Sequence, residues 1–364
     1  MEITAKMVKE LREMTGAGVM ACKNALVETE GDFDKAIEVL RKKGEATAVK
    51  KAGRIAAEGT VLAVVEGNKA AIVEVNSETD FVAKNDKFRT FVANIADQII
   101  ASDAATVEAL SEEKFVKDES KTVKEELVSQ IAVIGENLTI RRFTKINTDG
   151  VVVPYIHAGG RIGVLVEAVA ADANDDVKEA LKNIAMQIAA LNPKYTSRDE
   201  ISADELAKLR EITIDSALND TFTLPMPVLK GLLEKAVSDK VWSDEDIAIY
   251  EEKKDNMKYL PNFLSKEAKA ALAELALADK AAIVENKIFT GLVDGRVAKQ
   301  LKEICLLDQT YVKAEDGKQT VAQYVKTVGA DISIKGFVRY ETGEGIEKKS
   351  EDFAAEVAKQ MAGN

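Results

Sequence analysis

The chain has 364 residues, of which 46% are hydrophobic and 31% charged, so it is not a disordered chain and we expect roughly two to three globular domains. Its formal net charge of -12 argues against a stable nucleic-acid contact, because binding to phosphates needs clustered Lys and Arg. The absence of a secretory signal, of a CxxC pair and of an apolar run near the ~18 residues that cross a bilayer predicts a cytoplasmic protein without membrane contact.

Residues 1–45 predict a small module of three short helices. The third helix begins after Asp32 as N-cap and is expected to end at Gly44, and the connections are so short that neighbouring helices must pack on each other. A unit of this size buries little area, and such units usually exist to bind something. Residues 46–56 are expected to form a helical or flexible linker. The basic stretch 41–54 lacks interleaved aromatics and is interpreted as a solvated helix end.

From residue 57 the apolar pattern alternates with a period of two. Residues 57–145 predict a hairpin that turns at Gly67-Asn68, an amphipathic helix, a charged helical stretch over residues 106–133 and then a strand. The order of hairpin and helix recurs within residues 146–195, and the two amphipathic helices share the spacing "NIA-QI". This internal duplication predicts an α+β core of two subdomains with antiparallel sheets.

The composition of the chain changes again after residue 195. Residues 196–285 are charged and broken by prolines, which predicts a helical, coiled-coil-like insertion such as an antiparallel helical hairpin. Alternation over residues 332–340 predicts a strand that returns to the second subdomain, which then comprises residues 146–195 and 286–348. Residues 349–364 start at an N-cap serine with acids in the first turn and predict a C-terminal helix module.

Signatures of covalent chemistry are scarce. The single histidine, His157, lies in a predicted hairpin and has no second histidine to complete a zinc site. The glycine-rich segment "HAGGRIG" is followed by a strand, whereas a phosphate-binding loop needs a helix N-terminus, so a hairpin turn is favoured. The pattern favours a binding protein without a bound cofactor. Two alternatives stay open: a small-molecule enzyme that uses His157 or the glycine turns, and an adaptor whose residues 1–45 bind ubiquitin-like partners.

One connection contains an aromatic side chain that the fold does not require. The first hairpin reaches its helix through "VNSETDFVAKND", whereas the second repeat uses "AVAADANDD", which contains only small or acidic side chains after its strand valine. Phe81 therefore stands where a short polar turn would be enough. It is either a hydrophobic staple that covers the following helix or a residue with a role outside the fold.

Five motifs, taken in order, resemble the translation elongation factor Ts family: "LREMTGAGVMACKNAL", "TDFVAKN", "IGENLTIRR", "HAGGRIGVLVE" and "GEGIEKKSEDFAAEVAKQ". The resemblance covers residues 1–195 and 286–364. It implies an exchange factor that releases guanine nucleotide from elongation factor Tu without covalent chemistry. It also implies a ubiquitin-associated-like N-terminal domain, a core of two subdomains with a helical insertion, and a C-terminal module.

The resemblance further implies which residues touch the partner. In the family, the Asp-Phe segment enters the GTPase near its magnesium ion and shifts a neighbouring helix, which weakens the hold on GDP. The residues of this chain at that segment are Thr79, Asp80, Phe81 and Val82.

Two further surfaces are implied. The N-terminal module docks on the GTPase through Arg12, Val19 and Met20, although Val19 and Met20 are equally expected in the core of the module itself. Val357 and Met361 are the candidates on the C-terminal helix.

Two departures from the family pattern matter. Some relatives carry a histidine where this chain has Gln187, so a role of that histidine does not carry over. In some relatives the insertion mediates self-association, which leaves a homodimer through residues 196–285 open.

Overall fold

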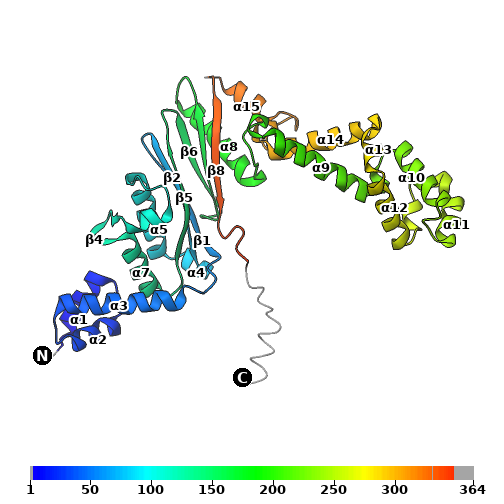
Figure 1. Cartoon of the computed structure of the whole chain (residues 1–364). Helices are drawn as coiled ribbons and strands as arrows, with labels where there is room; N and C mark the ends of the chain where they lie inside the picture. The colour runs from blue at the N-terminus through cyan, green and yellow to red at the C-terminus, as the bar shows by residue number, and fades with distance from the viewer. Residues whose placement is uncertain (1–2, 330, 348–364) are drawn as a thin grey trace. The chain divides into compact units, whose positions relative to one another are not determined.

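The computed structural model describes residues 3–329 and 331–347 (Figure 1). The chain divides into two compact units, the first made of Met1–Asn192 with Tyr324–Asn364 and the second of Pro193–Gln323. The described residues combine helices with antiparallel sheets, so the predicted α+β class is confirmed. The C-terminal helix module predicted for residues 349–364 lies outside the described residues.

The first unit begins with α1 (Ala5–Thr15), α2 (Val19–Glu28) and α3 (Phe33–Lys51), which pack around a small core. The buried side chains of that core are Val8, Leu11, Cys22, Ala25, Leu26 and Ala36. The helix α3 starts as predicted, because the Asp32 carboxylate accepts a hydrogen bond from the Lys35 amide at 3.1 Å.

The helix α3 does not end at Gly44, contrary to the prediction. Gly44 is buried within α3, which continues to Lys51 and packs along α7. Most of the predicted linker 46–56 is therefore helix. Several basic side chains of the stretch 41–54 pair with acids: Arg41 Nη1, for example, lies 3.0 Å from Glu125 Oε1.

Two three-stranded antiparallel sheets form the core of the first unit in the described part of the chain. The first has the order β1 (Glu58–Glu66), β2 (Lys69–Ser77) and β5 (Thr139–Asn147), and the second the order β6 (Val151–His157), β7 (Ile162–Val169) and β8 (Ser333–Glu341). The helix α5 (Asp86–Ala101) covers the outer face of the first sheet, and α8 (Asp175–Leu191) covers that of the second (Figure 1).

The two sheets share the same antiparallel strand arrangement, and their registers shift at corresponding points. In β2 the register shifts between Glu74 and Val75, where Glu74 faces Arg142 on β5. In β7 it shifts between Glu167 and Ala168, where Glu167 faces Gly336 on β8. The extra residue of each bulge lies on the outer strand next to the middle one, Arg141 on β5 and Lys335 on β8, at the same position in both sheets.

The inner faces of the two sheets pack on each other through the side chains of a shared cluster. The turn "HAGG" between β6 and β7 takes part in this contact, since Gly160 O accepts a hydrogen bond from the Val61 amide at 2.7 Å. Gly160 has φ +105°, and a Cβ there would lie 2.0 Å from Thr60 Oγ1. The glycines therefore allow the sheets to approach, and the interpretation of "HAGGRIG" as a hairpin turn is confirmed.

The charged stretch predicted to be helical over residues 106–133 contains a small hairpin. It folds as α6 (Val107–Glu112), β3 (Lys114–Phe115), β4 (Asp118–Thr122) and α7 (Val123–Ile134). The helix stops at Glu113 because this carboxylate accepts hydrogen bonds from Gln98 Nε2 at 3.0 Å and from Ser102 Oγ at 2.7 Å on another helix. Phe115 then turns inward and is buried.

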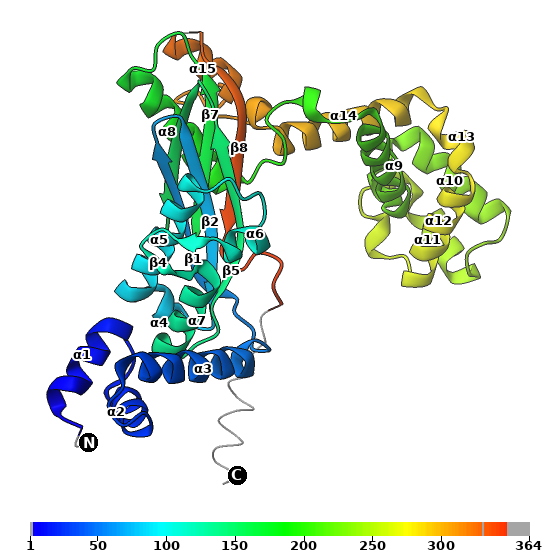
Figure 2. The ribbon, with the colours of Figure 1, turned by 60° about the vertical axis from the view of Figure 1, so that its left-hand side comes forward.

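The second unit is a helical cluster rather than a helical hairpin (Figure 2). Its core includes Leu218, Leu233, Leu272 and Phe289, together with Trp242, whose Nε1 donates to Ala268 O at 2.8 Å. Its α-helices are α9 (Ala203–Asn219), α10 (Met226–Ser238), α11 (Asp244–Lys253), α12 (Lys266–Ala278), α13 (Lys280–Val284) and α14 (Lys287–Ile304).

The second unit reaches beyond the boundaries 196–285 predicted for the insertion, because α14 packs on α9 in the same core. The remaining short elements are η1 (Arg198–Glu200), η2 (Thr221–Thr223), η3 (Lys254–Asn256), η4 (Leu260–Asn262), η5 (Leu306–Asp308), α4 (Asp80–Ala83) and α15 (Val321–Val328). Within residues 3–329 and 331–347, none of these helices combines the length and the apolar character that crossing a bilayer requires.

Candidate protein-binding site

The connection after β2 presents an aromatic side chain to solvent. It forms the single turn α4, which starts at Thr79 as N-cap, where Oγ1 accepts a hydrogen bond from the Val82 amide at 3.4 Å. Phe81 is 82% exposed, more than any other large hydrophobic side chain in the described ranges. Val82 is the residue that packs against the core behind α5. The interpretation of Phe81 as a hydrophobic staple is therefore wrong, and its ring is free for a partner.

Asp80, beside this ring, is an ionised carboxylate. Its Oδ2 lies 2.6 Å from Lys84 Nζ, and the hydrogen bond from Lys84 holds the pKa of Asp80 below its usual value. Asp80 also lines a surface cavity of about 250 Å³, which it shares with Arg89 and Arg161. The turn thus offers an aromatic ring next to a fixed negative charge.

Two carboxylates anchor the turn to the loop that precedes β5. Glu136 Oε2 accepts from the amides of Glu78 at 3.1 Å and Thr79 at 3.0 Å, and its Oε1 accepts from Thr79 Oγ1 at 2.6 Å. In the opposite direction, Glu78 Oε1 accepts from the Asn137 amide at 2.6 Å. Sequence analysis missed these anchors. The polar "GEN" in the motif "IGENLTIRR" was the available signal, but its partners lie almost sixty positions away in the chain.

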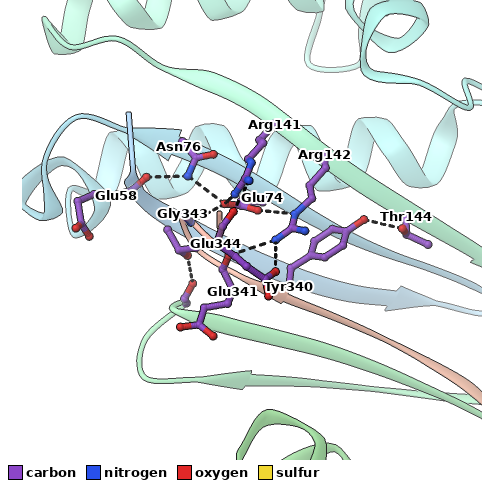
Figure 3. A network of polar contacts seen from close by, with 12 residues as sticks. Glu58, Glu74, Asn76, Arg141, Arg142, Thr144, Tyr340, Glu341, Gly343 and Glu344 are labelled. Carbon is purple, nitrogen blue, oxygen red and sulfur yellow. Dashed lines mark hydrogen bonds and ion pairs between the residues drawn. The ribbon is translucent and has the colours of Figure 1, made fainter. Parts of the chain in front are cut away.

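The strand β2, which leads into the turn, carries a buried carboxylate between the sheets (Figure 3). Glu74 Oε1 accepts from Asn76 Nδ2 at 3.1 Å, Arg141 Nη1 at 2.9 Å and the Gly343 amide at 2.8 Å, while its Oε2 accepts from Arg142 Nε at 2.6 Å. Burial acts to raise the pKa of Glu74, but these hydrogen bonds, first that from Gly343, outweigh it and hold the pKa below its usual value.

This network joins both sheets and the chain segment after β8 (Figure 3). The Arg142 guanidinium lies over the Tyr340 ring, 4.2 Å from its centre, and also reaches Glu344 Oε2 at 3.1 Å. The Tyr340 hydroxyl lies 2.6 Å from Thr144 Oγ1, so β8 of the second sheet is tied to β5 of the first. The strand that leads into the Thr79–Val82 turn is therefore tied to both sheets.

The sequence-predicted residues of the N-terminal module are exposed. Val19 is 49% and Met20 63% exposed, and both lie on α2 away from the core of the module. Arg12 on α1 is exposed as well, and it lines a hollow of the module together with Val19. The alternative that Val19 and Met20 fill the core is wrong. Val357 and Met361 lie outside the described residues.

The residues considered for catalysis are not assembled into a site. His157 ends β6 and is exposed, with Nδ1 3.0 Å from the Tyr155 hydroxyl. Among the described residues no group of three or more His, Cys, Asp or Glu side chains is placed to hold a metal ion. Gln187, where some relatives have histidine, is buried on α8.

An exposed aromatic on an anchored turn, with further apolar side chains exposed on a small helical module, is the kind of surface that mediates protein–protein contacts. The family model described as elongation factor TS matches residues 78–344. Elongation factor Ts of Clostridium kluyveri is 44% identical over 368 residues, covering 99% of each chain. That of Clostridium novyi is 44% identical over 364 residues, and that of Clostridioides difficile 42% over 363, each covering 99% of both chains. The chain belongs to the elongation factor Ts family of translation factors.

Proposed function

We propose that the chain is a guanine-nucleotide exchange factor for elongation factor Tu in translation elongation. It binds elongation factor Tu with GDP, disturbs the site of magnesium and phosphates, and promotes release of GDP so that GTP can bind. The process involves no covalent step and no cofactor bound to this chain. It takes place in the cytoplasm, where the partner works.

The exposure of Phe81 on an anchored turn is the observation that carries this proposal. Burying one phenylalanine side chain contributes about 1.5–3 kcal/mol of free energy. Because Glu136 and the Thr79 cap hold the turn in place before binding, little conformational entropy is lost on contact. The free protein thus presents a preformed apolar wedge with the Asp80 charge at its base.

The mechanism follows from linkage between two ligands of one GTPase. Magnesium is the largest local positive charge that holds the nucleotide phosphates, so a wedge that displaces its surroundings weakens GDP without any bond being broken. The factor must bind the GTPase better when GDP is absent, because a ligand shifts an equilibrium only by its difference in affinity. GDP then weakens binding of the factor by the same coupling.

The other surfaces would hold the partner while the wedge acts. The exposed Arg12, Val19 and Met20 are proposed to dock the N-terminal module, which we take to be ubiquitin-associated-like, on the GTPase domain. Val357 and Met361 are proposed as C-terminal contacts. A homodimer through residues 196–285 stays a prediction.

The test is stopped-flow release of fluorescent GDP from elongation factor Tu. The double variant Asp80→Ala/Phe81→Ala should lower the maximal release rate at saturating factor by at least about tenfold, the factor that corresponds to 1.4 kcal/mol. Phe263→Ala is the matched control, since it removes another exposed phenylalanine, in the second unit, and should leave the rate unchanged. A wild-type rate for the double variant would refute the wedge.

A further inference from the structure

The turn that carries Phe81 is too short to hold its own shape. The helix α4 has four residues, and a single helical turn is unstable in isolation because nucleation fixes several dihedral angles for one hydrogen bond. Asp80 and Phe81 are exposed and contribute little packing to the turn. Besides the packing of Val82 on the core, the orientation of the Phe81 ring must therefore depend on contacts at the start of the turn.

Glu136 supplies the contacts at that start. Its half-buried carboxylate accepts three hydrogen bonds, from two successive amides and one hydroxyl of the Glu78–Thr79 pair. Thr79 Oγ1 donates to Glu136 and at the same time accepts from the Val82 amide, so one hydroxyl links the carboxylate to the helix turn. Because Thr79 Oγ1 must point its proton at Glu136 while it accepts from the Val82 amide, Glu136 sets the rotamer of Thr79.

A second carboxylate, that of Glu78, fixes the connection after β2 against the connection before β5. Glu78 accepts from the Asn137 amide, and Asn137 Nδ2 donates to Arg54 O at 2.8 Å. Each loop therefore gives an acid to the backbone of the other. A carboxylate is needed at position 136 because it accepts at both oxygens, whereas a glutamine would turn its amide donor toward one of the three donors.

The internal duplication offers a comparison within the chain. In the first repeat Gly135 precedes β5 by four positions, and in the second Gly329 precedes β8 by four. The residue after the glycine is Glu136 in the first repeat and Ala330 in the second. The second repeat, whose connection lacks an aromatic, has no acid at this position, although Asp331 follows it. The acid thus goes with the exposed aromatic and not with the common fold.

We propose that Glu136 is a positioning residue for exchange: it does not need to touch the partner, and it fixes the Thr79–Val82 turn so that Phe81 is presented in one orientation. This inference rests on the proposed function. Loss of Glu136 leaves the ring exposed but mobile, so that binding of the partner survives better than the step in which the nucleotide leaves.

The experiment compares Glu136→Ala and Glu136→Gln in the full chain by stopped-flow GDP release from elongation factor Tu. Glu136→Ala should lower the maximal release rate by about tenfold. The factor concentration at half-maximal rate should change by less than about threefold. Glu136→Gln should fall between Glu136→Ala and the wild type. It also keeps the inference testable if the alanine variant does not fold.

Glu205→Ala is the matched control. Glu205 also accepts three hydrogen bonds, from the Ser202 amide, the Ser202 hydroxyl and the Tyr195 hydroxyl, but it lies in the second unit. This variant should release GDP at the wild-type rate. Hydrogen exchange of the amides in residues 77–85 should rise in Glu136→Ala and stay unchanged in Glu205→Ala, a readout that is independent of the partner.

A triple variant distinguishes a failure of the inference about Glu136 from a failure of the proposed function. If Glu136 acts through the turn, adding Glu136→Ala to Asp80→Ala/Phe81→Ala causes no further loss of rate. A further loss would show that Glu136 acts elsewhere and would overturn the inference. A defective double variant with a normal Glu136→Ala would overturn the inference but leave the proposed function intact. A normal double variant would refute the wedge itself.

Discussion

Replacing the buried Glu74 by glutamine should lower the free energy of unfolding of the first unit by about 3 kcal/mol. The carboxylate receives four hydrogen bonds, three at Oε1 and one at Oε2. Glutamine keeps the oxygen for the first three but turns an amide donor toward Arg142 Nε. The loss of that charge-assisted bond costs about 1.5–3 kcal/mol, and the Arg142 charge left without its buried partner adds to the cost.

The duplication provides the control for this substitution. Glu167 holds the same position in the second sheet, at the same bulge, but its side chain is 21% exposed and its one ion pair, with Lys335, spans 3.7 Å. Glu167→Gln should therefore cost less than about 1 kcal/mol. The same chemical change at equivalent positions thus separates the effect of the buried network from that of the residue type.

The measurement is urea unfolding of both variants, followed by far-ultraviolet circular dichroism. The only tryptophan, Trp242, lies in the core of the second unit, so its fluorescence reports that unit separately. Glu74→Gln should shift the dichroism transition and leave the fluorescence transition in place. Equal shifts for Glu74→Gln and Glu167→Gln, or a cost below about 1 kcal/mol for the former, would refute the assignment of stability to this network.

Two further predictions concern the same core. Folding lowers the pKa of Glu74 below its ordinary 4.5, so its contribution to stability is present above that pH and is lost as the pH falls through the folded-state pKa. Urea midpoints measured down to about pH 3 should therefore fall less in Glu74→Gln than in the wild type, and parallel curves would contradict this. Gly160→Ala should destabilise the first unit by about 3 kcal/mol, because of its positive φ and the 2.0 Å approach of a Cβ to Thr60 Oγ1. Gly159→Ala, with φ +67° and open space around it, should cost only about 1 kcal/mol, and equal costs would rule out the close approach as the cause.

Sequence periodicity predicted the elements whose contacts lie on one face. The hairpins, the helices α5 and α8 and the return of β8 follow from apolar spacing alone, because each strand or helix buries one face against a neighbour. The buried Glu74 could not be predicted this way, since an acid on a strand normally indicates solvent. Its partners Arg142 and Gly343 come from distant parts of the chain.

The wrong secondary-structure predictions share one physical cause. At these positions, contacts with residues far away in the sequence determine the structure, and the local sequence pattern does not reveal them. Gly44 predicted a helix end, but α3 continues through it to Lys51 and packs on α7. The stretch around Glu113 predicted a helix, but Gln98 and Ser102 hold its carboxylate and end the helix there. At the candidate site, sequence comparison of the two repeats singled out Phe81, whereas its exposure and its anchor Glu136 required the folded chain.

The interface between the two sheets contains equivalent residues of the two repeats. The pairs Val61 and Val152, Ile72 and Leu165, and Ile146 and Tyr340 occupy equivalent positions in the two repeats, and all six contribute to the cluster between the sheets. A symmetric dimer must present the same patch on both partners, whereas two halves joined in one chain need not remain identical. In this chain one half keeps a plain connection, and the other carries an exposed aromatic that a symmetric dimer would have to display twice.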